Sequence, residues 1–167
     1  MKQMWSPWRS QYIETFKDKD KKNQCFICEA IANQDLEKDK ELLVVKRSKF
    51  CIAILNKFPY NSGHILVAPL RHISVFEELQ PEELADIMNL VQKAIVIQKQ
   101  LFSPHGFNIG VNIGEAAGAG LPSHIHFHIV PRWSGDSNFT AVFADMKVIS
   151  ADLKKMQEEV SELFETI

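Results

Sequence analysis

Three histidines alternate with apolar residues in the segment Ser123 to Trp133, which reads SHIHFHIVPRW. Successive side chains of a β-strand point to opposite faces, so the imidazoles of His124, His126 and His128 are expected on one side of a sheet. A neutral imidazole nitrogen can attack phosphorus and later leave it, while neighbouring imidazoles orient it, bind a phosphate oxygen or hold a metal. Three solvated histidines are the alternative. The pattern favours a cleft suited to phosphoryl chemistry.

A glycine-rich segment lies directly before the histidines. It contains Gly118 and Gly120, and Ser123 immediately precedes His124. Glycine allows backbone N–H groups to approach and surround an anion. An ordinary tight loop would use the same glycines, but their place beside imidazoles favours a phosphate-binding loop.

Two of the three cysteines, Cys25 and Cys28, are separated by two residues. One turn of chain can direct both thiolates at a single ion, and Zn²⁺ accepts cysteine and histidine in a tetrahedral set, so two further ligands are needed. Two buried apolar cysteines on a helix are the alternative. A redox pair is disfavoured because no βαβ pattern surrounds it, and Cys51 is expected in the core.

The elements that would position these residues follow from hydrophobic periodicity. The strongest helix is 81–102, where apolar residues recur at three- and four-residue spacing. A shorter helix is predicted for 25–32, and a final one from about Ser150, which is a suitable N-cap. Five segments have the character of strands: 42–46, 50–55, 64–69, 107–114 and 124–131. Short connections between strands predict an α+β fold with a largely antiparallel five-stranded sheet and two main helices.

Composition limits the class of protein. The chain has 167 residues, 46% hydrophobic and 24% charged, which fits one domain at residues 25–167 after an irregular N-terminal arm at residues 1–24. The net charge of −2, with lysines interleaved among acidic residues, disfavours binding to polymeric nucleic acid or to an anionic membrane. The first residues lack the apolar stretch of a signal peptide and no segment approaches the ~20 apolar residues of a membrane span, so we expect a cytoplasmic protein.

The chain closely resembles the histidine triad family. The motif HIHFHIV (124–130) carries the resemblance, which extends to NKFPYNSGHILVAPLRHI (56–73), similar to the family's nucleoside-binding segment. The segment VNIGEAAGAGLPS (111–123) is similar to its phosphate loop. The resemblance implies that His126 is the nucleophile, which attacks the α-phosphorus of a nucleotide and forms a covalent nucleotidyl-histidine.

The resemblance also implies roles for other residues. Asn56 would bind the ribose, although it also suits a turn, and His64 would lie by the nucleoside or its phosphate, although it could simply end a strand. His128 would bind a phosphate oxygen or orient His126. Arg132 is a candidate for stabilising phosphate charge. The phosphate path would be lined by Asn112, Gly118, Gly120 and Ser123.

Family members with this cysteine spacing bind structural zinc with two histidines. The resemblance therefore implies a closed zinc site made of Cys25, Cys28, His72 and His124. It also implies a homodimer. We expect no organic cofactor.

Three segments look most like the branch that cleaves diadenosine polyphosphates, including bacterial phosphorylases: WSPWRSQYI (5–13), VPRW (130–133) and GDSNF (135–139). The chain departs from the eukaryotic dinucleotide hydrolases, because AGAGLP (117–122) stands where their Gly-Gln loop would be. We expect cleavage of a diadenosine tetraphosphate-type substrate, with the nucleotidyl group passing from His126 to water, which gives AMP, or to inorganic phosphate, which gives ADP. An adenosine phosphoramidate hydrolase and a non-catalytic nucleotide-binding module are the alternatives.

Overall fold

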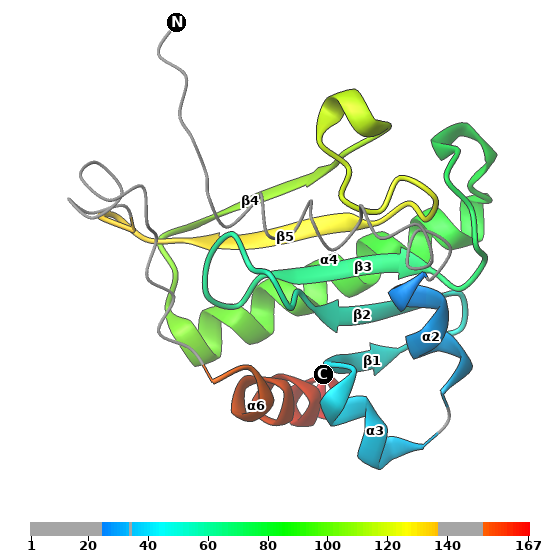
Figure 1. Ribbon diagram of the computed structural model, residues 1–167. Coiled ribbons are helices and arrows are strands. Elements are labelled where there is room, and N and C mark those ends of the chain that lie inside the picture. Colours follow the sequence, from blue (N-terminus) through cyan, green and yellow to red (C-terminus); the bar gives the residue numbers. More distant parts are fainter. Residues whose placement is uncertain (1–24, 34, 137–151) are drawn as a thin grey trace, which may run out of the picture.

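A five-stranded sheet lies at the centre of the computed structural model, which describes residues 25–33, 35–136 and 152–167 (Figure 1). The strand order is β1-β2-β3-β5-β4, and every neighbouring pair is antiparallel. The predicted α+β fold class is therefore confirmed, whereas the predicted arm at 1–24 lies outside the described residues. The strands are β1 (Val44–Arg47), β2 (Cys51–Leu55), β3 (Ile65–Pro69), β4 (Gly106–Val111) and β5 (Phe127–Arg132).

The long helix α4 (Pro81–Phe102) covers one face of the sheet, where it packs on β2, β3 and β5 (Figure 1). Its first turn is closed by the Glu83 carboxylate, which accepts the Gln80 backbone N–H at 2.8 Å. Its apolar stripe is buried against the sheet and supplies much of the core. The buried apolar residues of this stripe are Ile87, Leu90, Val91, Ala94 and Ile97.

Helix α6 (Leu153–Thr166) packs on β1 and α4. It begins later than predicted, because its N-cap is Asp152, whose carboxylate accepts the N–H groups of Lys154 and Lys155. Ser150, the predicted cap, lies outside the described residues. None of the helices in the described ranges is both long and apolar enough to cross a membrane.

Two short helices attach to the β1 edge of the sheet: α2 (Phe26–Ala32), which was predicted, and α3 (Leu36–Glu41), which was not. In the charged run at 37–41, Glu37, Lys38 and Glu41 are exposed. Asp39 is instead buried and pairs with Arg47 of β1, whose guanidinium also donates to the carbonyl of Ala30 at 2.8 Å. One partly buried ion pair thus connects both helices to the sheet.

Two strands are shorter than predicted at the ends that carry candidate site residues. β4 ends at Val111, so Asn112 follows the strand, and β5 begins at Phe127, so only one of the three histidines lies within it. The pairing of β3 with β5 stops at Val67 and Phe127. Pro69, two residues farther along β3, has no N–H to offer a longer ladder.

Candidate active site and metal cluster

The alternation of the histidine segment places His126 and His128 on the face of the sheet opposite α4. Phe127 and Ile129, the residues between and after them, are buried in the hydrophobic core as predicted. The rings of His126 and His128 meet edge to face, with centroids 5.0 Å apart. Both side chains are buried, which excludes the alternative that these two histidines are solvated.

The protonation pattern of His126 follows from one contact. Its Nδ1 lies 2.8 Å from the backbone carbonyl oxygen of His124. A carbonyl only accepts hydrogen bonds, so Nδ1 carries the proton and donates it, and Nε2 is left with a lone pair. Burial lowers the pKa of His126 below its usual value, although this hydrogen bond opposes the shift. The ring is therefore neutral near pH 7, as a nucleophile must be.

The protonation pattern of His128 follows from its partner His64. The backbone N–H of Tyr60 donates to His64 Nδ1 at 3.1 Å, and the Asn56 side-chain amide lies 3.2 Å from the same atom. His64 Nε2 must then carry the proton, and it donates to His128 Nδ1 at 3.0 Å. The proton of a neutral His128 is consequently on Nε2.

The Nε2–H of His128 is buried and has no hydrogen-bond partner among the described residues. Burial, together with the neighbouring histidines, lowers the pKa of His64 to about 3 and that of His128 to about 4, so both rings are neutral. An unused buried donor is costly unless a ligand pairs with it. Because the His128 ring adjoins the His126 ring, a phosphoryl oxygen would be a suitable partner for this donor.

The structure joins Asn56 and His64 to this cluster, and their contacts with a nucleotide stay predictions. The side-chain oxygen Oδ1 of Asn56 accepts the Phe58 backbone N–H at 2.9 Å. The side-chain NH₂ of Asn56 therefore faces His64. His64 is 1% exposed and lies behind His128. The contact that His64 makes is therefore with another imidazole, a role that the sequence could not indicate because it depends on the Tyr60 backbone.

The predicted phosphate loop forms a turn after β4. The carbonyl of Glu115 accepts the Gly118 N–H at 2.9 Å, and Gly118 has a φ of 85°, which glycine adopts readily. Asn112 and Gly120 are half-buried and Ser123 is exposed. Their contacts with phosphate stay predictions.

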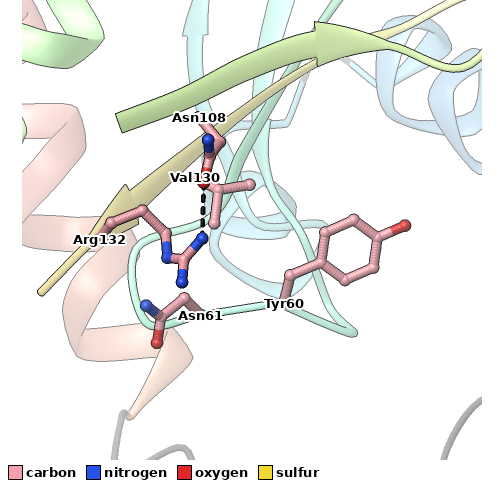
Figure 2. A pocket seen from close by; sticks show the side chains of 5 residues that line it. All are labelled: Tyr60, Asn61, Asn108, Val130 and Arg132. Carbon is pink, nitrogen blue, oxygen red and sulfur yellow. Dashed lines mark hydrogen bonds between the residues drawn. The ribbon is translucent and has the colours of Figure 1, made fainter. Parts of the chain in front are cut away.

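A hollow is lined by Tyr60, Asn61, Asn108, Val130 and Arg132 (Figure 2). The Tyr60 ring stacks on His128, with centroids 5.7 Å apart. Arg132 donates to Asn108 Oδ1 at 2.7 Å and forms a salt bridge with Asp136, which raises the pKa of its guanidinium. The positive charge of Arg132 is thus compensated, and its action on phosphate stays a prediction. Asn61 and Asn108 could not be recognised from the sequence, because isolated polar residues in a loop and a strand carry no motif.

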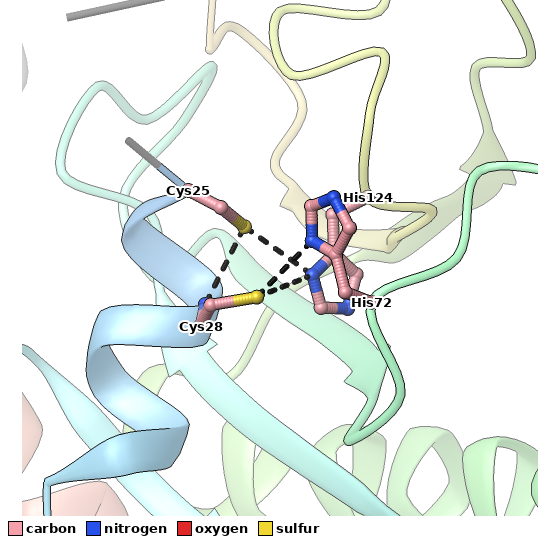
Figure 3. Close-up of side chains that lie close together, drawn as sticks. All are labelled: Cys25, Cys28, His72 and His124. Carbon is pink, nitrogen blue, oxygen red and sulfur yellow. Dashed lines mark hydrogen bonds between the residues drawn. The ribbon is translucent and has the colours of Figure 1, made fainter. Parts of the chain in front are cut away.

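The four predicted metal ligands converge at the start of α2 and the loops after β3 and before β5 (Figure 3). Their ligand atoms all lie within 4.8 Å of one another. Cys25 Sγ is 3.3 Å from His124 Nδ1, and Cys28 Sγ is 3.1 Å from His72 Nδ1. A tetrahedral zinc with ordinary bond lengths separates sulfur and nitrogen ligands by about 3.6 Å. The cluster therefore has nearly the size that the ion requires.

The orientation of His124 also suits a metal. Its Nε2 lies 2.9 Å from the carbonyl oxygen of Pro69 and donates to it, which leaves the lone pair on Nδ1, facing the cysteines. Burial and the neighbouring Cys25 raise the pKa of the Cys28 thiol to about 11. Two adjacent thiols become thiolates readily only when a cation compensates their charge.

Residues 37–135, more than half of the chain, match the HIT domain family. The chain belongs to this family. This HIT protein is 40% identical over 150 residues to the AP-4-A phosphorylase of Mycobacterium tuberculosis (strain ATCC 25618 / H37Rv), a match that covers 89% of this chain and 77% of that one. It is 32% identical over 123 residues to the asymmetrical bis(5'-nucleosyl)-tetraphosphatase of Schizosaccharomyces pombe, covering 74% and 64% of the two chains.

Among solved structures, the HIT protein resembles a zinc-bound histidine triad family protein from Mycobacterium smegmatis. The TM-score is 0.67 at 22% identity, and the match covers 86% of this chain and 94% of that one. This likeness supports the fold. The predicted histidine triad family is confirmed.

Proposed function

We propose that this HIT protein is a nucleotidyl hydrolase or transferase that cleaves dinucleoside polyphosphates of the diadenosine tetraphosphate type. One observation carries the proposal: the His126 ring, whose Nε2 is bare, and the His128 ring, whose Nε2 carries a proton, have centroids only 5.0 Å apart. A nucleophile and a donor for a phosphoryl oxygen are the two groups that displacement at phosphorus demands of a protein.

The reaction takes two displacements. In the first, the His126 Nε2 lone pair forms a bond to the α-phosphorus and the bond to the bridging oxygen breaks, which releases ATP from diadenosine tetraphosphate. In the second, an oxygen of the acceptor bonds to phosphorus and the P–N bond to His126 breaks. The His124 carbonyl stabilises the positive charge of the substituted ring, and His128 stabilises negative charge on a non-bridging oxygen.

Inorganic phosphate is the proposed acceptor, so the second product is ADP. Support comes from the relative named AP-4-A phosphorylase, which is 40% identical, against 32% for the relative named a tetraphosphatase. Within this proposal, His64 acts through His128 and not on the nucleotide itself. The remaining residues keep their predicted nucleotide-binding roles: Asn56, Asn112, Gly118, Gly120 and Ser123.

The assay of purified protein with diadenosine tetraphosphate separates the possible reactions. With phosphate present we expect ATP and ADP, and chromatography of the nucleotides measures them. AMP in place of ADP would show that water is the acceptor. Faster turnover of an adenosine phosphoramidate, assayed side by side, would contradict the proposed substrate class and favour the phosphoramidase alternative.

We also propose that the four-residue cluster of Cys25, Cys28, His72 and His124 holds structural zinc. Two thiolates and two imidazoles complete a tetrahedral set, so the ion would cross-link α2 to the loops beside β3 and β5 and leave no position for substrate. We place the protein in the cytoplasm, where reducing conditions keep cysteines unpaired and available to a metal.

A homodimer paired through β4 is the proposed assembly. β4 is one of the two edge strands of the sheet, and the apolar side chains of Ile109 within it and Ile113 just after it are 47% and 52% exposed. An exposed apolar edge strand is a template for pairing with a second chain.

Light scattering after size exclusion tests this assembly. At about 10 μM the unsubstituted protein, called the parent below, is expected to have twice the mass of one chain. Ile109→Lys is expected to lower the mass toward that of one chain, because the substitution places a charge in the interface. Ile167→Lys makes the same replacement at an isoleucine that is 44% exposed at the end of α6, and it should leave the dimer intact. A monomeric parent would refute the proposal.

A further inference from the structure

Gln98 lies on α4, and its side-chain amide makes one hydrogen bond, to a backbone carbonyl. The residue is 0% exposed, and its Nε2 donates to the carbonyl of Gly63 at 2.6 Å. Its Oε1 is buried and has no partner among the described residues. A buried amide with half of its hydrogen bonding unmet costs stability, so an apolar residue would serve the core of α4 at least as well. The hydrogen bond itself is what this side chain contributes.

The turn that Gln98 holds has little freedom to move. Gly63 has a φ of +77°, and a Cβ added there would lie 3.2 Å from Pro131 Cγ and 3.3 Å from Phe102 Cε2. The peptide is thus fitted between the end of α4 and β5, and Gln98 fixes its carbonyl from the same helix. Gly63 is followed directly by His64.

His64 converts that backbone position into the orientation of a second imidazole. Its Nε2–H donates to His128 Nδ1, which leaves the proton of His128 on Nε2, toward the phosphoryl site. A shift of His64 by a fraction of an ångström lengthens this bond and allows His128 to place its proton on Nδ1. In that tautomer His128 presents a lone pair to the phosphoryl oxygen, which repels it.

We propose that Gln98 is a positioning residue for catalysis, acting through the Gly63 carbonyl and His64 to keep the His128 Nε2–H directed at the substrate. The inference rests on the proposed function for its kinetic consequence. The effect on the tautomer of His128 does not depend on which substrate is cleaved.

Gln157 of α6 provides a matched control. It is 6% exposed, and its Nε2 donates to the carbonyl of Val44 at 2.5 Å. It is therefore also a buried helical glutamine bonded to one backbone carbonyl. Val44 belongs to β1, at the opposite edge of the sheet from β4 and separated from β5 by two strands.

The test compares Gln98→Met with Gln157→Met in the full-length protein, since methionine keeps the volume and removes the donor. We expect kcat for diadenosine tetraphosphate to fall about 10- to 100-fold in Gln98→Met with KM changed less than about threefold, because the hydrogen bond to the transition state weakens. Gln157→Met should keep kcat within about twofold of the parent. In a His64→Asn background, Gln98→Met should lower kcat no further.

A readout independent of turnover is the ¹⁵N NMR spectrum of the histidine rings. The parent should show His128 protonated at Nε2, and Gln98→Met should show a mixture of both tautomers. An unchanged tautomer, an unchanged kcat, or an equal loss in Gln157→Met would overturn the inference. Gln98→Leu, which also removes the donor, serves if the methionine variant does not fold. A parent that cleaves no dinucleotide would refute the proposed function, and the tautomer measurement would still decide the role of Gln98.

Discussion

Replacing His126 with alanine is expected to abolish turnover of diadenosine tetraphosphate, with kcat reduced about 10⁴-fold or more. His126 presents the bare imidazole nitrogen of the cluster, because its Nδ1–H is held by the His124 carbonyl. His128 cannot substitute, since its Nδ1 accepts from His64 and its Nε2 carries the proton. The nucleophile is therefore lost without a replacement.

Mass spectrometry of the acid-quenched reaction gives the second readout for this variant. The parent should gain the mass of one nucleoside monophosphate during turnover, and the variant should gain nothing. His105→Ala is the control, because His105 is exposed and its Nδ1 accepts the Ser134 N–H at 2.8 Å, away from the cluster. Full activity in His126→Ala would eliminate the assigned role. Nucleotide binding by a parent that forms no adduct would favour the non-catalytic binding module.

The alternation of the histidines predicted the face they share, because strand geometry places every second side chain on one side. It did not predict where β5 begins. The extended chain continues back to His124 without pairing to β3, because Pro69 ends that ladder and its carbonyl instead accepts from the His124 ring. Local pattern thus predicted the orientation of the side chains, and a residue distant in the sequence determined the limit of the strand.

The two roles assigned to histidine rings differ in how far sequence could predict them. The metal cluster was predicted because cysteine and histidine are specific ligand types and the family resemblance supplied the partners. The relay from Tyr60 through His64 to His128 depends on a backbone N–H, and any residue other than proline supplies one. Gln98 and the helix α3 were missed for a related reason, since their polar groups become informative only when burial and partners are known.

Loss of the metal cluster is expected to have the largest effect on stability. Parent protein purified without chelators should contain about one zinc per chain, and Cys28→Ser should contain almost none, because serine does not replace a thiolate ligand. The variant should also melt more than about 10 °C lower, since the ion stabilises only the folded state. Metal analysis and calorimetry measure the two effects.

The same variant should lower activity as well as stability, because the metal cluster and the nucleophile share a residue. The His124 ring faces the cysteines, and the His124 carbonyl accepts the Nδ1–H of His126. If His124 moves when the ion is lost, the Nδ1–H loses its acceptor. The proton of His126 is then free to occupy Nε2, which removes the lone pair of the nucleophile. Cys51→Ala is the matched control: Cys51 is buried in β2 and outside the cluster, so this variant should lose about 1 kcal/mol of stability to a small cavity and keep its zinc. Zinc retained in Cys28→Ser, or a parent with far less than one equivalent, would rule out the four-ligand site. Zinc lost with activity intact would show that the His124 carbonyl holds its place without the ion.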